Sequence, residues 1–221
     1  MTNRTALVSG ATGLIGNQLL RLLLEDDDYA RVIVFVRRPL GWGHKKLEQH
    51  IVDFDSLEEY AALATADDVF CCLGTTRSQA GSEENFRRVD CDYVIRLARV
   101  CRAAGASQFL VVSALGAALD SKFFYNRVKA EMEQGLSETG YPALVILRPS
   151  LLLGKRLENR LGEDFSRIGL KAFDFALRGR FKRYRPIEAA LVARAMQRSA
   201  KQGLGGIQIL ESENIRTIAA A

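Results

Sequence analysis

Cysteine, histidine, proline and tryptophan are all scarce in this chain of 221 residues, with 4, 2, 4 and 1 copies. The cysteines form no C-x-x-C pair and no metal-ligand spacing, so we expect buried, reduced thiols rather than a disulfide framework or a zinc site. The histidines lie in a polar stretch with no partner motif, which favours loop positions. These residues are Cys71, Cys72, Cys91, Cys101, His44 and His50.

Long apolar runs are also missing. No run reaches the length of a membrane span, so we expect no transmembrane helix. The first apolar run, residues 6–8, begins almost at once and leaves no room for a secretory signal peptide. We therefore expect a cytosolic (cytoplasmic) protein.

Charge is present in excess but is not concentrated. The net charge of +5 favours anionic ligands, yet the basic residues are spread along the chain, which argues against nucleic-acid binding. The densest basic stretch is 178–185, with two aromatic residues. It fits a solvated loop, and alternatively a contact for a phosphate-bearing substrate or an acidic protein partner.

The pattern of the chain alternates between buried strands and amphipathic helices. A hydrophobic content of 48% and a charged content of 26% are those of a globular protein. The alternation predicts an α/β fold with a doubly wound parallel sheet and right-handed crossovers. We expect one domain over 1–221, with a dinucleotide-binding core in 1–150 and a smaller substrate part in 151–221. The expected strands are 6–8, 32–36, 50–52, 108–112, 142–147 and 206–210, with a further strand, followed by a turn of small residues, in 67–77. The expected helices are 14–24, 83–104, 121–138 and 187–200, with a loop or frayed helix at 40–49 and a short tail after 210.

A glycine triplet with the spacing G-x-x-G-x-x-G lies between the first strand and the first helix. Gly10 permits a tight turn, Gly13 lets the backbone approach a ligand, and Gly16 lets the helix pack close to the strand. A helix that begins here offers free N–H groups and a positive dipole end to a pyrophosphate. An ordinary turn is the alternative, but the strand–turn–helix context favours a dinucleotide site. Its intervening residues are Ala11, Thr12, Leu14 and Ile15.

The end of the second expected strand indicates which cofactor is bound. An NAD site has an acidic residue about 20 residues after the glycines, where it binds the ribose 2′-OH. This chain has Arg37 and Arg38 there. Because a guanidinium pairs well with a phosphate, we expect NADP(H), with both arginines at the 2′-phosphate. Two surface arginines that close a strand are the alternative.

Two further pairs of residues follow strands at the same edge of the sheet. Asp53, with its neighbour Phe54, is placed to meet the adenine end of the cofactor, although a helix-capping Asp fits equally well. Leu73 and Gly74 follow the fourth strand, which lies beside the first in a doubly wound sheet. We expect both to pass close to the cofactor.

The chemical motif is Tyr-x-x-x-Lys. Tyr125 and Lys129 share one helical face, and an ammonium near a phenol lowers the phenol pKa from its usual value of about 10. Such a tyrosine can exchange a proton with a substrate oxygen near neutral pH. Ser113, at the end of the preceding strand, is placed to hydrogen-bond a substrate carbonyl. Together the three residues predict hydride exchange between nicotinamide and a carbonyl or alcohol, although each has an ordinary structural explanation on its own.

In these motifs the chain resembles an atypical short-chain dehydrogenase/reductase, of the kind with a G-x-x-G-x-x-G motif. Within that superfamily the chain is similar to the Tat-interacting-protein group of NADP(H)-binding proteins, most specifically in Cys-Cys-Leu-Gly-Thr-Thr-Arg at 71–77. The similarity covers most of 5–155 and includes stretches 52–60 and 89–94.

The resemblance implies a Rossmann-type sheet with the nicotinamide near Tyr125 and Lys129. It also implies that Lys129 hydrogen-bonds the nicotinamide ribose and that Pro149 and Ser150 border the nicotinamide. The chain departs from the group at Ser113-Ala114, where the group often has two serines, and no motif marks the superfamily's catalytic asparagine. Two hypotheses follow: an NADP(H)-dependent oxidoreductase, or an NADP(H)-binding regulatory protein that acts through a protein partner and turns over little.

Overall fold

The computed structural model describes residues 3–153 and 185–221. Its centre is a sheet of seven parallel strands in the order β3-β2-β1-β4-β5-β6-β9. The order reverses direction at β1, which lies between β2 and β4, as in a doubly wound Rossmann sheet. The predicted α/β fold class is confirmed. The strands are β1 (Arg4–Ser9), β2 (Tyr29–Val36), β3 (Leu47–Ile51), β4 (Asp68–Cys71), β5 (Gln108–Val112), β6 (Ala143–Arg148) and β9 (Gly206–Glu211).

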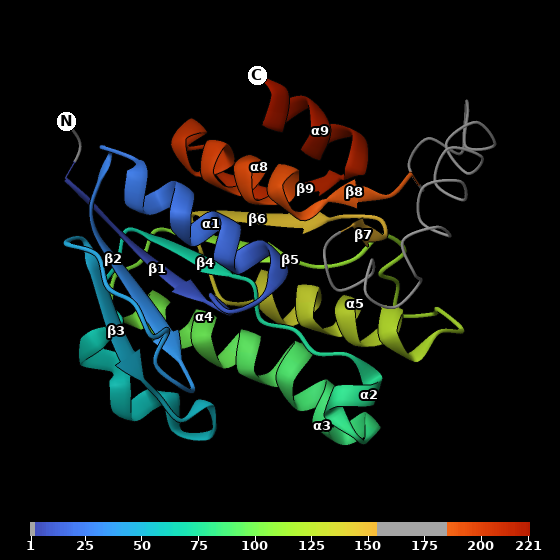
Figure 1. The fold of residues 1–221 in the computed structure, drawn as a ribbon. Coiled ribbons are helices and arrows are strands. Elements are labelled where there is room, and N and C mark those ends of the chain that lie inside the picture. Colours follow the sequence, from blue (N-terminus) through green and yellow to red (C-terminus); the bar gives the residue numbers. More distant parts are fainter. Residues whose placement is uncertain (1–2, 154–184) are drawn as a thin grey trace.

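Helices cover both faces of this sheet (Figure 1). One face is covered by α1 (Leu14–Glu25), α8 (Ala189–Gln202) and α9 (Ser212–Ala220). The other is covered by α4 (Tyr93–Ala103) and α5 (Phe124–Ser137). The smaller elements are η1 (Phe54–Leu63), α2 (Arg77–Ala80), α3 (Glu83–Arg87), η2 (Arg88–Asp92), β7 (Leu152–Leu153) and β8 (Ile187–Glu188).

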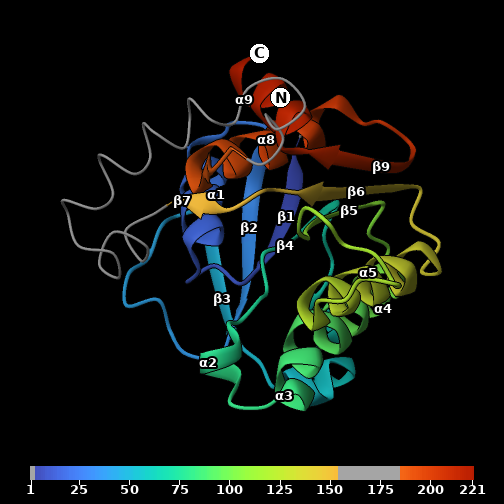
Figure 2. The ribbon, with the colours of Figure 1, turned by 90° about the vertical axis from the view of Figure 1, so that its right-hand side faces the viewer.

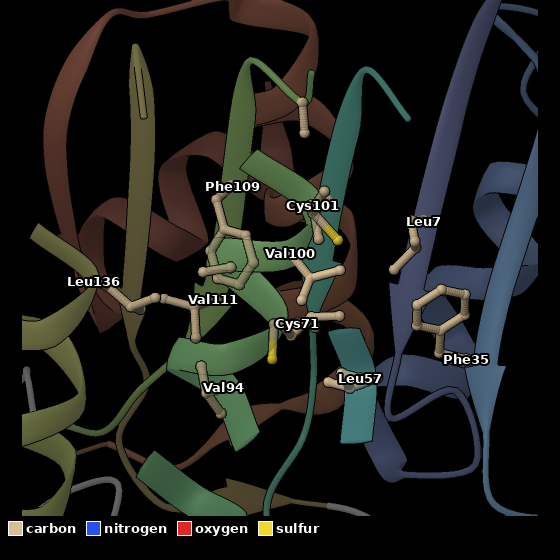
Figure 3. Packing of buried hydrophobic residues seen from close by; sticks show 14 of the residues in the cluster. Leu7, Phe35, Leu57, Cys71, Val94, Val100, Cys101, Phe109, Val111 and Leu136 are labelled. Atoms are coloured by element: carbon tan, nitrogen blue, oxygen red, sulfur yellow. The ribbon is translucent and has the colours of Figure 1, made fainter. Parts of the chain in front are cut away.

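The two faces follow from strand alternation, because successive side chains of a strand point to opposite sides. In β1, Leu7 packs into the core beneath α4 and α5, whereas Ala6 and Val8 pack into the core beneath α1 and α8. Figure 3 shows the core beneath α4 and α5 from close by, with Leu7 on β1, Phe35 on β2 and Val94 on α4. Burial on both faces explains why these strands read as continuous apolar runs.

The amino edge of the sheet contains a buried polar cluster. Asp68, fully buried at the start of β4, accepts hydrogen bonds from Arg4 and from the Tyr29 hydroxyl, the latter at 2.7 Å. Burial raises the pKa of Asp68, and these two partners offset only part of that effect. The cluster joins β1, β2 and β4 at the edge opposite to the glycine turn.

Four expectations about elements need correction. The third strand is Leu47–Ile51 rather than 50–52, so it begins within the stretch expected as loop or frayed helix. The expected helix 187–200 begins only at Ala189, because Ile187–Glu188 form the short strand β8. The expected helix 83–104 contains a π-helical turn, η2, between α3 and α4. The expected tail after residue 210 is helix α9, which buries Ile215 and Ala219.

The last strand comes from the C-terminal part of the chain, yet it extends the main sheet. β9 pairs with β6 along its whole length, and Figure 2 shows the two side by side. Within residues 3–153 and 185–221, no helix is long and apolar enough to cross a membrane. Of the basic stretch 178–185, only Arg185 lies in the described residues.

Candidate functional site

The glycine turn is pressed against the end of β4. Gly10 has a φ of +83°, and a Cβ at this position would lie 2.4 Å from the carbonyl carbon and oxygen of Cys72. A Cβ at Gly16 would lie 2.2 Å from the Gly10 oxygen. Only glycine therefore fits at these two positions, and the turn keeps α1 close to the ends of β1 and β4.

The amino end of α1 has no side-chain cap. Gly13 is the N-cap residue and also donates its N–H to the Gly10 oxygen at 3.0 Å. Thr12 is exposed beside it, while Ala11 and Ile15 are buried. The N–H groups of the first turn, which includes Leu14, thus have no side-chain acceptor from the cap, an arrangement that suits an anion.

Arg37 and Arg38 follow β2 at the same edge of the sheet. β2 is the neighbour of β1, with Phe35 opposite Ser9. Both arginines are exposed. In the part of the chain that the structure describes, neither guanidinium has a hydrogen bond or an ion pair with another residue, so both are free to meet an anion.

Asp53 caps a helix. Its carboxylate accepts a hydrogen bond from the Asp55 N–H at 2.9 Å at the start of η1. The helix-capping reading of this residue is therefore present in the structure, and the exposed carboxylate still lies past the end of β3. Phe54 is buried, with its ring 5.6 Å from that of Tyr93.

Tyr125 and Lys129 lie one turn apart on α5 but differ sharply in exposure. Tyr125 is 38% exposed and packs against Phe86, with ring centroids 5.7 Å apart. Lys129 is only 3% exposed, and its Nζ lies 2.9 Å from Oδ1 of Asp90. A buried ammonium needs such a partner, because transfer of an unpaired charge out of water is very costly.

Asp90 is a residue of the site that the sequence reading missed. It lies in the π-helical turn η2, and its Oδ2 accepts the Thr75 N–H at 2.8 Å. It therefore joins the turn after β4, where Gly74 is exposed and Leu73 half-buried, to Lys129 on α5. A lone acid among the apolar positions of the helical pattern, four residues after buried Phe86, was the available signal.

The pKa of Lys129 reflects this pairing. Burial alone lowers the pKa of the ammonium, but the Asp90 carboxylate and the nearby Tyr125 phenol outweigh it, so the pKa lies above its usual value. Lys129 therefore stays protonated throughout the physiological pH range. It lies one turn after Tyr125 on α5.

Ser113 lies at the end of β5, as its sequence position predicts, but its side chain already has a partner. It is buried at the end of β5, and its hydroxyl donates to Oε1 of Glu133 on α5. Glu133 is paired in turn with Arg148 at the end of β6. Glu133 also escaped the sequence reading, although it continues the Tyr125–Lys129 face by one more turn.

Pro149 and Ser150 connect β6 to the C-terminal part of the chain. The Pro149 oxygen accepts the Leu115 N–H at 2.9 Å, and the Ser150 N–H donates to Oγ of Ser212 at 2.8 Å. Both residues therefore lie at the carboxyl edge of β6, held between the loop after β5 and the start of α9.

Comparison with known proteins agrees with this geometry. A family model described as NAD(P)H-binding matches residues 10–161. The chain belongs to this NAD(P)H-binding family. It is 35% identical over 220 residues to protein HTATIP2 of Rattus norvegicus, covering 97% of this chain and 89% of the relative. The predicted resemblance to atypical short-chain dehydrogenases and to the Tat-interacting-protein group is confirmed.

Solved structures with the same fold include two enzymes. The Bordetella bronchiseptica enzyme WbmH in complex with NAD+ has a TM-score of 0.69 at 16% identity, covering 95% of this chain and 75% of that one. The UDP-Glc/GlcNAc 4-epimerase of Campylobacter jejuni has a TM-score of 0.68 at 13% identity, covering 97% and 82%. At these identities the likeness shows the Rossmann fold alone.

Other relatives correct the expected location. Protein FMP52-1 of Scheffersomyces stipitis, named as mitochondrial, is 33% identical over 157 residues, which is 69% of each chain. Protein FMP52 of Eremothecium gossypii, also named as mitochondrial, is 33% identical over 177 residues. These names contradict the expectation of a cytosolic protein, which we withdraw.

Proposed function

We propose that this protein is an NADP(H)-dependent oxidoreductase that transfers hydride between nicotinamide and a carbonyl or alcohol substrate. This proposal rests on one observation: the partly exposed Tyr125 lies one helical turn before Lys129, which is buried and paired with Asp90. A charged lysine one helical turn from a phenol stabilises the phenolate, and this arrangement suits proton exchange with a substrate oxygen.

The residues at the carboxyl edge fit a dinucleotide. The glycine turn keeps the start of α1 close to the ends of β1 and β4, and the uncapped end of α1 suits the pyrophosphate. Arg37 and Arg38 are exposed beside it and would pair with a 2′-phosphate, so we propose a preference for NADP(H) over NAD(H). Asp53 and Phe54 would flank the adenine end, and Leu73 and Gly74 would line the path past β4. Pro149 and Ser150 would border the nicotinamide.

Tyr125 is the general acid and base in this proposal. In the reducing direction its hydroxyl donates a proton to the carbonyl oxygen, and the ammonium of Lys129 stabilises the phenolate that remains. Asp90 keeps that ammonium charged and in place. The bound nicotinamide supplies or accepts the hydride.

We also propose that two parts of the chain have different roles in the site. Residues 1–150 would bind the cofactor, and the smaller part, 151–221, would shape the substrate site within the same domain. The hydrogen bond of Ser150 with Ser212 and the pairing of β9 with β6 connect the two parts.

The test is a panel of aldehydes, ketones and α-dicarbonyl compounds, with NADPH consumption followed by absorbance, on wild type and on Tyr125→Phe. We expect at least one compound to be reduced, and we expect Tyr125→Phe to lower kcat by about 100-fold or more while it leaves NADPH affinity unchanged. Equal turnover by wild type and Tyr125→Phe would refute the role of Tyr125.

One observation favours a second candidate, an NADP(H)-binding regulatory protein with little turnover that acts through a protein partner. The hydroxyl of Ser113 is already donated to Glu133, so it is not available to polarise a carbonyl. Tight NADPH binding without reduction of any compound of the panel would favour this candidate.

A further inference from the structure

The side chains of Ser113, Glu133 and Arg148 form a trio that joins three neighbouring elements at the carboxyl edge of the sheet, with Ser113 and Glu133 buried and Arg148 half-buried. Glu133, on α5, is 7% exposed, and Ser113, after β5, is 4% exposed. Arg148 ends β6, and its Nε lies 3.0 Å from Oε1 and 3.2 Å from Oε2 of Glu133. The backbone holds the trio in register, because the Ser113 N–H donates to the Leu147 oxygen at 2.7 Å.

This arrangement fixes the direction of the Ser113 hydrogen bond. The guanidinium of Arg148 can only donate, so it requires both carboxylate oxygens of Glu133 to accept. The same hydrogen bond to Glu133 raises the pKa of Arg148, so the guanidinium keeps its charge. A carboxylate in this state has no proton to give. The Ser113 hydroxyl must therefore be the donor, and its single proton is directed at Glu133.

We propose that Glu133 is a positioning residue that makes Ser113 a hydrogen-bond acceptor toward the substrate. A hydroxyl has one proton and two lone pairs, so a serine with its proton engaged can only receive a hydrogen bond from a ligand. This inference rests on the proposed function and reverses the role expected for Ser113. The site would then hold the hydroxyl of an alcohol better than the oxygen of a carbonyl.

The proton balance of the reaction is unchanged by this role. In reduction, the proton that appears on the product oxygen comes from Tyr125, which becomes a phenolate, and the hydride comes from the reduced nicotinamide. The new hydroxyl group can then donate to Oγ of Ser113. Ser113 gains and loses no proton, and Glu133 remains a carboxylate throughout.

Glu133→Gln should reverse the direction of the hydrogen bond between this side chain and Ser113 while it keeps the side-chain volume. Arg148 would retain the amide oxygen, which leaves the amide NH₂ to face Ser113. Ser113 would then accept from the glutamine and have its own proton free for the substrate. Glu131→Gln is the matched control, because Glu131 lies on the same helix and pairs with exposed Arg87 instead.

The first experiment is independent of cofactor and substrate. In proton NMR of the ¹⁵N-labelled protein, with nitrogen-bound protons filtered out, a buried hydroxyl that donates to a carboxylate gives a protected downfield signal. The Tyr29 hydroxyl, which donates to buried Asp68, provides an internal standard that Tyr29→Phe identifies. We expect a second signal, with and without NADPH, that Ser113→Ala and Glu133→Gln abolish and Glu131→Gln preserves.

The outcomes separate the proposal from the proposed function. If the Tyr29 signal is present and no signal depends on Ser113, the fixed hydroxyl does not exist and the proposal is overturned. If Glu133→Gln fails to fold, the wild-type and Ser113→Ala spectra still decide. Failure of NADPH to bind would refute the proposed function and leave this signal in place.

A second experiment tests the substrate preference on a carbonyl compound that the panel shows to be reduced. We expect Glu133→Gln to weaken binding of the product alcohol to the NADPH complex and to strengthen binding of the carbonyl to the NADP⁺ complex, each by about 3- to 10-fold. Equal effects on both ligands, or none, would contradict an acceptor role for Ser113.

Discussion

At the scale of single residues, the candidate site contains the buried charged residues Lys129, Asp90 and Glu133, of which the sequence predicted only Lys129 as a site residue. Tyr125 and Lys129 could be predicted because their spacing places them on one helical face. The contacts of Asp90 and Glu133 could not be predicted, because each contact joins two different elements and depends on how those elements pack in the fold. Asp90 reaches Lys129 from another helical segment, and Glu133 reaches Ser113 from another element.

The Lys129–Asp90 pair makes a prediction about stability. We expect Asp90→Ala to lower the free energy of unfolding by about 3 kcal/mol, because it leaves a buried ammonium without its carboxylate. Asp90→Ala combined with Lys129→Met should recover most of that loss. Urea unfolding at pH 7 measures both. Asp92→Ala is the matched control from the same turn, since Asp92 pairs with Arg87 at the surface and should cost less than about 1 kcal/mol.

The same pair predicts a pH dependence. The pKa of Lys129 in the folded protein lies above its usual value of 10.5, so the stabilisation is fully present below that pH and is lost only as the pH rises through the folded pKa. The difference in unfolding free energy between wild type and the double variant should therefore be constant from about pH 7 to pH 9. A steady rise over that range would show that Lys129 is not held in its charged form, because the unfolded state would then bind more protons than the folded state.

At the scale of elements, the core strands could be predicted and the irregular elements could not. Buried parallel strands give continuous apolar runs, and each expected strand has a counterpart in the sheet. The strand β3 was misplaced because its three central residues are polar and none of its residues is fully buried, so it gives no continuous apolar run. The π-helical turn η2 was hidden because one extra residue in a turn barely disturbs an apolar pattern. It is this turn that contains Asp90.

The glycine turn gives a test at the same scale. Alanine normally stabilises a helix relative to glycine by up to about 1 kcal/mol. We expect Gly16→Ala to do the opposite and to abolish nucleotide binding, because its Cβ would lie 2.2 Å from the Gly10 oxygen, a backbone atom that cannot move away. Thermal unfolding measures the first effect and calorimetry the second.

Gly135→Ala is the control on α5. There the nearest atom is Cδ1 of Ile95, the end of a flexible side chain, at 2.4 Å. This variant should keep nucleotide binding. Normal binding by Gly16→Ala would show that the close packing of α1 on the turn is not needed for the site.

At the scale of the whole molecule, the parallel sheet gathers the site from segments that are far apart in the sequence. The glycine turn follows β1, the two arginines follow β2, and Tyr125 and Lys129 lie on the helix between β5 and β6. The carboxyl ends of all these strands meet at one edge, where ligands bind in doubly wound folds. The doubly wound sheet, with the fourth strand beside the first, could be predicted from the sequence. The helix α9 could not, since its apolar residues lie in a short segment.

The most direct test of the account is titration calorimetry with NADPH and NADH on wild type and on Arg37→Ala combined with Arg38→Ala. We expect wild type to bind NADPH about 10- to 100-fold more tightly than NADH, because charge-assisted hydrogen bonds to a phosphate are strong. The double variant should lose that preference and retain its NADH affinity. Arg99→Ala combined with Arg194→Ala, two exposed arginines on α4 and α8, controls for net charge. Failure of wild type to bind either nucleotide, or a preference that survives the loss of Arg37 and Arg38, would contradict the account.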